Sequence, residues 1–438
     1  MGRADHTLTA PPRLERPGQE PVSPHETERE GYAPPRLLVA GGAALAVAMG
    51  IGRFAYTPIL PAMEAAAHLD TNQAGLLASA NYAGYLAGAL ATAIIPRAAR
   101  GRVLVVSLLA VVVTTALMAG TTSLAAWGVI RFLSGLASAG VFVLASGIVL
   151  DALRRQGRAS LSGWLFSGVG VGIALSGAVV RVAGGALGWR GEWLALALIA
   201  AVALYPSWRW LPLARGAAAT TTRARPITTT RARPITTARA RPITTARERP
   251  ILSRAVRAAL ALLLLAYLLE GLGYIVTGTF LVAIVERMPG LGGFGPSVWI
   301  VVGLAAAPSG VLWAGLAARI GYARALALAY VVQACGIGLP LLGGAGAALL
   351  SAVLFGGTFI GISTLTLTLA GQITPRRSAG LIGLLTAAFG LGQIAGPLLA
   401  GVLAGHTHNF GPALTAAAAI VLLGGILMAA LQPFDPSR

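Results

Sequence analysis

Long runs of apolar residues follow one another along most of the chain, and short polar segments separate them. A helix needs about 20 apolar residues to cross the hydrocarbon core of a bilayer. The pattern predicts twelve such helices, at residues 37–62, 72–95, 103–121, 124–150, 160–183, 192–211, 257–285, 297–318, 323–343, 345–370, 378–404 and 412–432. The expected fold class is therefore an all-α membrane protein with twelve transmembrane helices.

The polar segments give the expected domain organisation. The parts are a disordered cytoplasmic tail at 1–36, an N-terminal six-helix bundle at 37–211, a basic cytoplasmic linker at 212–256, a C-terminal six-helix bundle at 257–432 and a cytoplasmic tail at 433–438. The first tail is rich in proline and in charges of both signs, which is typical of disorder.

The linker contains a repeat of eight residues: 223-RARPITTT, 231-RARPITTA, 239-RARPITTA and 247-RERPILSR. The proline in each unit prevents a continuous helix. We interpret the array as a flexible spacer, as is usual for low-complexity segments. The alternative is that the arginines at 223–254 bind anionic lipid at the membrane surface.

The composition narrows the possible chemistry. The chain is 56% hydrophobic and 11% charged, as expected for a membrane protein. Every basic residue is arginine, so neither a phosphate-binding GxxxxGK[ST] loop nor a Schiff-base lysine can occur. The single cysteine, Cys335, excludes an intrachain disulfide. His406 and His408 precede the last helix, but loop histidines need no metal, and we expect no cofactor.

The net charge of +19 is distributed unevenly. The connections that follow even-numbered helices hold 21 arginines, whereas the opposite connections hold three, Arg181, Arg190 and Arg287. Arginine-rich connections stay in the cytoplasm. We therefore expect cytoplasmic termini in a bacterial-type inner (plasma) membrane, and no role in binding nucleic acid.

Three pairs of segments indicate that the two halves are internal repeats. The stretch 49-MGIGRFAYTPIL-60 aligns with 270-EGLGYIVTGTFL-281 at an offset of 221 residues. Similarly, 170-GVGIALSG-177 aligns with 390-GLGQIAGP-397, and 132-FLSG-135 with 354-LFGG-357. Two repeated bundles around a central cavity are the architecture of alternating-access transporters.

Several motifs add a family resemblance. The segment 131-RFLSG-135 is similar to the RxxxG element of the major facilitator superfamily, 392-GQIAGPLLAG-401 to its antiporter-type motif, and 188-GWRGEW-193 to its GWR element. The loop motif between the second and third helices is degenerate, because Ala318 of its second copy stands where the acidic residue should be. The segments GIGRFAYTPILP, ASANYAGYLAGAL and GLGYIVTGTFL resemble the YbfB/YjiJ-like subfamily. The resemblance implies the fold and a transport role, but no substrate.

Three charged residues lie inside predicted spans, where such residues commonly mark a substrate or proton path. We interpret Glu270 as a protonatable carboxylate that shares a helix face with Tyr267, Tyr274 and Thr277. Arg53 could bind an anionic substrate group, snorkel to the outer interface, or pair with Glu270. For the third, Arg131, the resemblance implies proton coupling or organisation of the cavity.

Four neutral side chains complete the candidate substrate or proton pathway: Tyr56, Asn81, Tyr85 and Gln393. Each could hydrogen-bond a ligand or a neighbouring helix. The glycine motifs 168-GVGVG-172 and 390-GLGQIAG-396 lie in apolar runs without a preceding strand, so they predict close helix packing and not dinucleotide binding.

These features predict a secondary active transporter that moves a small organic solute by alternating access, with proton coupling as a hypothesis. The two arginines against one glutamate favour an anionic solute. Proton-driven efflux of drugs or amphipathic compounds is the alternative within transport. A non-transporting sensor and a membrane enzyme are alternatives of other classes, the latter disfavoured because no acid/base cluster lies in the spans. We expect a monomer, with a small-molecule substrate and the lipid bilayer as partners.

Overall fold

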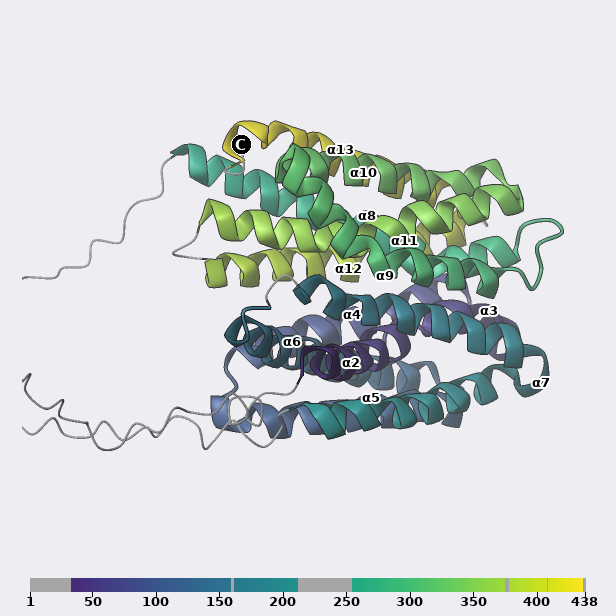
Figure 1. The fold of residues 1–438 in the computed structure, drawn as a ribbon. Coiled ribbons are helices and arrows are strands. Elements are labelled where there is room, and N and C mark those ends of the chain that lie inside the picture. The colour runs from purple at the N-terminus through teal and green to yellow at the C-terminus, as the bar shows by residue number, and fades with distance from the viewer. Residues whose placement is uncertain (1–32, 159–160, 212–253, 375–377, 408, 436–438) are drawn as a thin grey trace, which may run out of the picture.

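The computed structural model describes residues 33–158, 161–211, 254–374, 378–407 and 409–435 (Figure 1). These residues form helices and connections and contain no strand. The predicted tail through residue 32, the octapeptide repeats of 223–254 except Arg254, the proposed lipid contact of that array and the last three residues lie outside the described residues.

The first half contains six predicted spans. The first span consists of α2 (Pro34–Leu45), the π-helix η1 (Ala46–Ile51) and α3 (Tyr56–Ala67). It is followed by α4 (Thr71–Ala93), η2 (Arg97–Ala99), α5 (Arg100–Leu117), η3 (Met118–Gly120), α6 (Leu124–Arg155) and α7 (Ser162–Trp210). The long α7 covers two spans, because Gly188 interrupts it with a φ of 60°.

The second half contains the other six spans. They are α8 (Arg254–Glu286), α9 (Gly295–Ile320), α10 (Tyr322–Gly338) with η5 (Leu339–Leu342), α11 (Gly344–Ile373), α12 (Ser378–Thr407) and α13 (Gly411–Ala430), followed by η6 (Gln432–Phe434).

The predicted number of spans agrees with this helix order. Ten helical segments of the described chain are long and apolar enough to cross a membrane. Counting α7 as two spans, and adding the 23-residue α4, gives twelve. The first helix begins at Pro34, three residues earlier than expected, because proline is well tolerated in the first turn of a helix.

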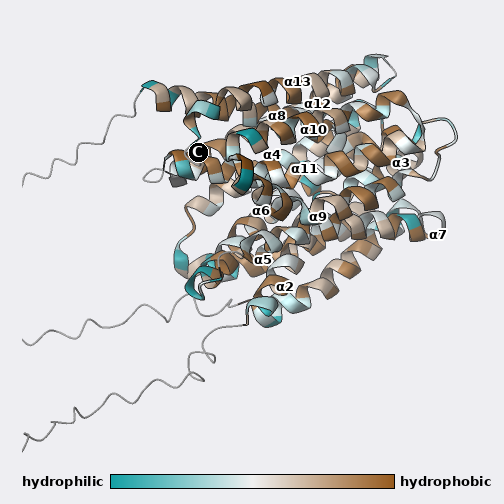
Figure 2. Ribbon diagram, turned by 45° about the horizontal axis from the view of Figure 1, so that its top comes forward, coloured by the Kyte–Doolittle hydropathy of each residue, from teal (hydrophilic) through white to brown (hydrophobic). Residues whose placement is uncertain are grey.

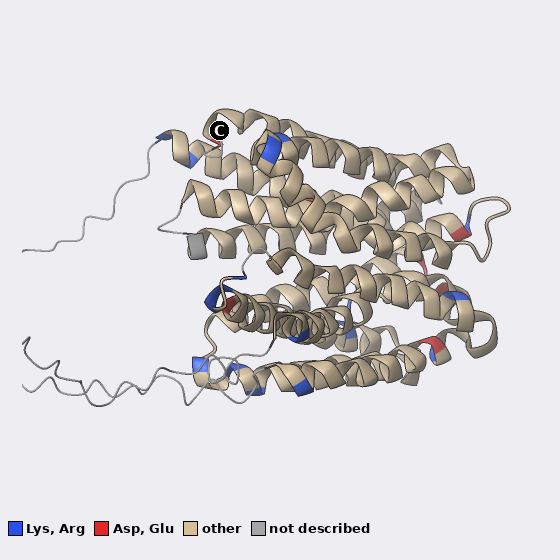
Figure 3. Ribbon diagram, viewed as in Figure 1, with Lys and Arg blue, Asp and Glu red and all other residues tan. Residues whose placement is uncertain are grey.

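The two halves of the chain form two groups of helices. In Figure 1 the helices of the first half lie together below those of the second half. Hydrophobic residues cover most of the helix surfaces in Figure 2, and Figure 3 shows the charged residues mainly towards the two ends of the molecule. The end where α7 finishes and α8 begins is called the linker end, and the opposite end, with the α8–α9 connection, the far end.

Close packing of glycines joins the two groups of helices. The helices α7 and α9 cross where Gly170 lies against Gly303 and Ala307. A Cβ atom on Gly170 would approach the backbone nitrogen of Ala307 to 2.4 Å, so this crossing excludes side chains. The packing role predicted for the glycine motifs is confirmed here and at Gly392, where a Cβ would lie 2.3 Å from the carbonyl oxygen of Leu268.

The internal repeat is visible in one direct contact. The hydroxyl group of Thr57 in α3 donates a 2.6 Å hydrogen bond to the carbonyl oxygen of Gly278 in α8. These two residues are 221 positions apart, which is the offset of the repeat. Equivalent residues of two repeats can touch only near their pseudo-twofold axis, so this contact places the axis between α3 and α8.

Substitution Gly170→Ala tests the crossing of α7 and α9. We expect it to destabilise the protein by about 1–3 kcal/mol, the usual cost of an overpacked contact, and to lower the melting temperature in detergent. The matched control is Gly185→Ala in the same helix, where nothing lies within 4 Å of the added methyl group. Equal melting temperatures of the two variants would contradict the packing argument.

Candidate functional site

The first span is interrupted in the middle of the membrane helix. The π-helix η1 ends at Ile51, and residues 52–55 form a turn before α3 begins. Among the described residues, no backbone N–H group donates to the carbonyl oxygens of Gly52 and Arg53. Such free carbonyls are expensive inside a membrane unless other groups satisfy them. The first span therefore has a break in its backbone hydrogen bonding at Gly52 and Arg53.

Helix α6 supplies the missing donors. The guanidinium of Arg131 lies 3.4 Å from the carbonyl oxygen of Gly52 and 3.3 Å from that of Arg53. The hydroxyl of Ser134 donates to the same Gly52 oxygen at 2.9 Å, and Ser138 donates to Ala48 at 2.8 Å. Arg131 is only 1% exposed and acts on the backbone of the first span from within the bundle.

Two other candidates hold Arg131 in place. The ring of Tyr56 lies 4.7 Å from the guanidinium carbon, and the Asn81 amide donates to the Arg131 carbonyl at 2.9 Å. The Tyr56 hydroxyl donates to the carbonyl of Ala74 at 3.1 Å. In this structure the polar groups of Tyr56 and Asn81 bond to neighbouring helices. This is the alternative in which neither side chain binds a ligand.

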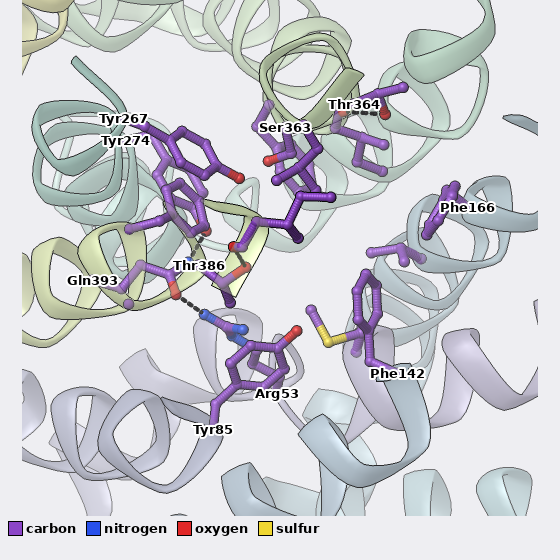
Figure 4. Close-up of a pocket in the computed structure, with 18 of the residues that line it drawn as sticks. Arg53, Tyr85, Phe142, Phe166, Tyr267, Tyr274, Ser363, Thr364, Thr386 and Gln393 are labelled. Carbon is purple, nitrogen blue, oxygen red and sulfur yellow. Dashed lines mark hydrogen bonds between the residues drawn. The ribbon is translucent and has the colours of Figure 1, made fainter. Parts of the chain in front are cut away.

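A cavity of about 490 Å³ lies between the two groups of helices. The first half lines it with Met49, Arg53, Tyr85, Phe142 and Phe166. The second half lines it with Tyr267, Tyr274, Phe359, Phe389 and Gln393. Figure 4 shows the two tyrosines of α8 on one side, the phenylalanines Phe142 and Phe166 on the other, and Arg53 with Tyr85 between them. The volume is in the range of pockets for small organic ligands.

The cavity reaches the linker end and is closed towards the far end. Arg154 lines it near the end of α6, and its side chain is 68% exposed. At the far end, Arg287 and Glu64 form a 2.9 Å ion pair between the two halves. The Tyr82 and Thr279 hydroxyls are 3.2 Å apart across the same boundary, next to the bond from Thr57.

Arg53 is bound to neutral groups. Its Nη2 atom donates a 2.7 Å hydrogen bond to Oε1 of Gln393, and Nε2 of Gln393 donates to the Tyr274 hydroxyl (Figure 4). The rings of Tyr82 and Tyr85 lie 4.7 and 4.3 Å from its guanidinium carbon. Within the described residues no carboxylate lies within 4 Å of Arg53, so the alternative of an ion pair with Glu270 does not occur in this structure.

Glu270 is not part of the cavity lining, although Tyr267 and Tyr274 on the same helix are. At 100° per residue, Tyr267 and Tyr274 are only about 20° apart around α8, whereas Glu270 is turned by about 60° from Tyr267 and about 40° from Tyr274. Its carboxyl group lies beside Gln333 of α10 and is 1% exposed. One of its oxygens, Oε2, has no hydrogen-bond partner.

The structure therefore divides the nine candidates into two sets. Five line the cavity: Arg53, Tyr85, Tyr267, Tyr274 and Gln393. Four are buried outside its lining: Tyr56, Asn81, Arg131 and Glu270.

Sequence reasoning missed most of the aromatic lining. Phe142, Phe166, Phe359 and Phe389 sit in apolar runs, where nothing distinguishes a cavity-facing phenylalanine from a packed one. It also missed Glu192, which is 2% exposed at the predicted start of a span. His408 lies outside the described residues, and no group of three metal-ligating side chains occurs within them.

The fold and the cavity between its halves define a transporter of the major facilitator type. Two solved structures with this fold match most of the chain: the nucleoside transporter NupG in its D323A mutant (TM-score 0.68, 12% identity, 91% of this chain and 99% of that chain) and NupG itself (TM-score 0.63, 12% identity, 91% and 98%). At this identity the match concerns the fold.

The family is identified by sequence. A family model described as "Uncharacterised MFS-type transporter YbfB" matches residues 45–240 and 227–429, and the chain belongs to this family. A curated relative, the chloramphenicol resistance protein of Streptomyces lividans, is 29% identical over 382 residues, which are 83% of this chain and 88% of that protein. The predicted family is confirmed, and the protein is a transporter and not an enzyme.

Substitution Arg131→Met tests the support of the broken span. The Arg53 carbonyl loses its donor and the Gly52 carbonyl keeps only Ser134, so we expect a loss of roughly 2–5 kcal/mol in stability and a clear fall in the melting temperature. Arg131→Lys should recover part of this loss, because lysine also donates but cannot reach both carbonyls in one plane. Arg319→Met, at an exposed position of α9, is the control. A melting temperature for Arg131→Met equal to that of the control would contradict this role.

Proposed function

We propose that this transporter moves small organic anions by alternating access and that Arg53 binds their acidic group. The observation that carries the proposal is a buried arginine without a counter-charge. Arg53 is 2% exposed, lines the cavity and has a neutral glutamine as its direct partner. Its Nε atom has no hydrogen-bond partner.

The energetics favour an anion at this position. A buried charge is costly unless it is paired and hydrogen-bonded, and charges within membrane spans mark substrate and ion paths. The cavity lining contains Arg53 and Arg154 but no acidic side chain among the described residues. An acidic group of the substrate would supply the missing partner, so occupied and empty states would differ in electrostatic energy.

The conformation supports an orientation of the transporter in the membrane, with the linker end in the cytoplasm. The linker end carries most of the arginines of the connections, which favours a cytoplasmic position in a plasma membrane, with both termini on that side. The cavity reaches this end, and the Glu64–Arg287 pair lies at the other. On this proposal the structure is the inward-facing state of a monomeric transporter.

We also propose that transport is coupled to the movement of protons, and that Glu270 carries the coupled proton. Its carboxyl group is buried among Tyr267, Tyr274, Tyr330 and Gln333, and no cation lies within 4 Å among the described residues. A carboxyl group in such a place is more stable with its proton bound. Tyr274 connects it to the cavity, since Gln393 bonds to both Tyr274 and Arg53.

Substitution Arg53→Gln tests the anion site. We expect the affinity for a transported organic anion to fall roughly 10- to 100-fold, because a charged hydrogen bond is lost from a buried site. Uptake of labelled organic acids into proteoliposomes measures this effect. Arg319→Gln is the charge-matched control on an exposed helix end. Unchanged uptake by Arg53→Gln would exclude Arg53 as the binding group.

Substitution Glu270→Gln tests the coupling. The amide has the shape of the protonated carboxyl group, so we expect the folded protein to keep its melting temperature. Transport driven by a pH gradient should lose its dependence on the gradient, whereas exchange of substrate across the membrane should continue. Flux in proteoliposomes with and without a pH gradient measures both. If the gradient accelerates the variant as it does the wild type, Glu270 does not carry the coupled proton.

Efflux of drugs is the second candidate function. It is favoured by the similarity to the chloramphenicol resistance protein and by the aromatic lining of the cavity. Chloramphenicol carries no acidic group, so the flux assay with this compound separates the candidates. Transport of chloramphenicol by wild type and Arg53→Gln alike, without transport of any organic anion, would replace the primary proposal.

A further inference from the structure

Aromatic rings form both walls of the cavity. On the wall from the second half, Tyr267 and Phe389 stack with ring centroids 4.4 Å apart and planes 15° apart. Phe389 and Tyr274 continue the row at 5.4 Å and 10°, and Tyr274 and Phe359 at 6.0 Å and 12°. Four rings from three helices therefore present nearly parallel planes along one side.

The opposite wall comes from the first half. Tyr85 of α4 contacts Phe142 of α6 at 6.4 Å between ring centroids, and Phe142 contacts Phe166 of α7 at 5.9 Å. Figure 4 shows Thr386 between the tyrosines of α8 and Tyr85. A flat molecule in the cavity would contact rings from both halves of the transporter, because both line it.

Two unused hydrogen-bond donors of the cavity lie on Arg53 and Tyr274, which share Gln393. The hydroxyl groups of Thr364, Thr368 and Thr386 donate to carbonyl oxygens of their own helices at 2.8 Å, so they offer a ligand no proton. Arg53 keeps its Nε hydrogen unused, and the Tyr274 hydroxyl accepts from Gln393 and keeps its own hydrogen. The lining thus combines these two donors with aromatic, aliphatic and hydroxyl side chains.

We infer that the substrate is an aromatic carboxylate of one or two rings, an inference that rests on the proposed role of Arg53 in anion binding. The carboxylate binds at Arg53 beside the Tyr274 hydroxyl, and the ring lies between the two rows. The nearly parallel rings of the second-half wall attract a planar aromatic ligand through offset stacking, and the rings of the first-half wall, 61° and 42° apart, through edge contacts, beyond the area that the ligand buries. A saturated ring of similar size has no face to stack, so the aromatic ring is the preferred feature of the substrate.

Both parts of this substrate bind where the halves meet. Arg53 belongs to the first half, whereas Gln393 and Tyr274 belong to the second. The rows Tyr85–Phe142 and Tyr274–Phe389 are likewise divided between the halves. An aromatic acid therefore contacts both sides of the boundary that must rearrange during transport.

The test uses three matched probes and isothermal titration of the purified, full-length protein in detergent. Benzoate carries a ring and a charge, cyclohexanecarboxylate carries the charge without the aromatic ring, and benzamide carries the ring without the charge. We expect benzoate to bind about 5- to 10-fold more tightly than cyclohexanecarboxylate, the range that stacking supplies. Benzamide should bind roughly 10- to 100-fold more weakly than benzoate.

Two variants locate the effect. Phe389→Leu and Phe142→Leu keep an apolar side chain on each wall but remove one ring, and each should reduce the ratio of benzoate to cyclohexanecarboxylate affinity towards one. Phe280→Leu is the control, because Phe280 packs against Phe410 near the far end and does not line the cavity. The ratio within one variant is independent of any general loss of stability.

The outcomes separate this inference from the proposed function. Equal affinities of benzoate and cyclohexanecarboxylate, both lost in Arg53→Gln, overturn the aromatic preference and leave anion transport standing. Equal affinities of benzoate and benzamide, both unaffected by Arg53→Gln, overturn the anion site and retain the aromatic one. No binding of any probe to protein that unfolds cooperatively overturns both.

Discussion

The contact between Arg131 and the backbone of the first span supports the rest of the site. A continuous helix would satisfy its own carbonyl groups, but it would not open at Gly52 and Arg53. Opening it inside a membrane requires donors from elsewhere, since neither lipid nor water is there to provide them. The guanidinium of Arg131 and the hydroxyl of Ser134 provide them from α6. The buried charge of Arg131 thus has a structural use, and Arg53 is left as the charge that faces the cavity.

The buried charges Arg53 and Glu270, one in each half, are kept apart. Arg53 donates to Gln393 and Glu270 lies beside Gln333, so a neutral amide accompanies each. A direct pair between arginine and glutamate would neutralise both groups and leave neither to respond to a ligand or a proton. Tyr274, the repeat equivalent of Arg53, lies between them and shares Gln393. The duplication has therefore placed a charge in one half and its neutral counterpart in the other.

The fold could be predicted from the sequence, because the features that determine the fold are local patterns of residues. Apolar runs of about 20 residues, the arginine distribution and the repeat offset each depend on neighbouring residues or on simple counting, and they predict twelve spans. The position of Arg53 and the shared face of Tyr267 and Tyr274 also follow from helical periodicity. The orientation of Glu270 does not, because a turn of about 60° decides between the cavity and α10, and only packing settles it.

The aromatic lining and the far-end ion pair could not be predicted for a related reason. Phe142 and Phe389 are ordinary apolar residues until two helices from different halves face each other. Glu64 and Arg287 lie 223 positions apart, and no sequence spacing relates them. Such features depend on how the halves meet, which is a property of the assembled fold.

The contact of Thr57 with Gly278 has a mechanical consequence. Points on a rotation axis move least when two bodies turn about it, and points far from the axis move most. A bond that lies between repeat equivalents can act as a fulcrum and persist while the halves tilt. The Glu64–Arg287 pair lies nearer the far end than this fulcrum, with Arg287 48% exposed, and has the longer lever arm. Opening of the far end would thus separate this pair first, while the centre of the molecule keeps its register.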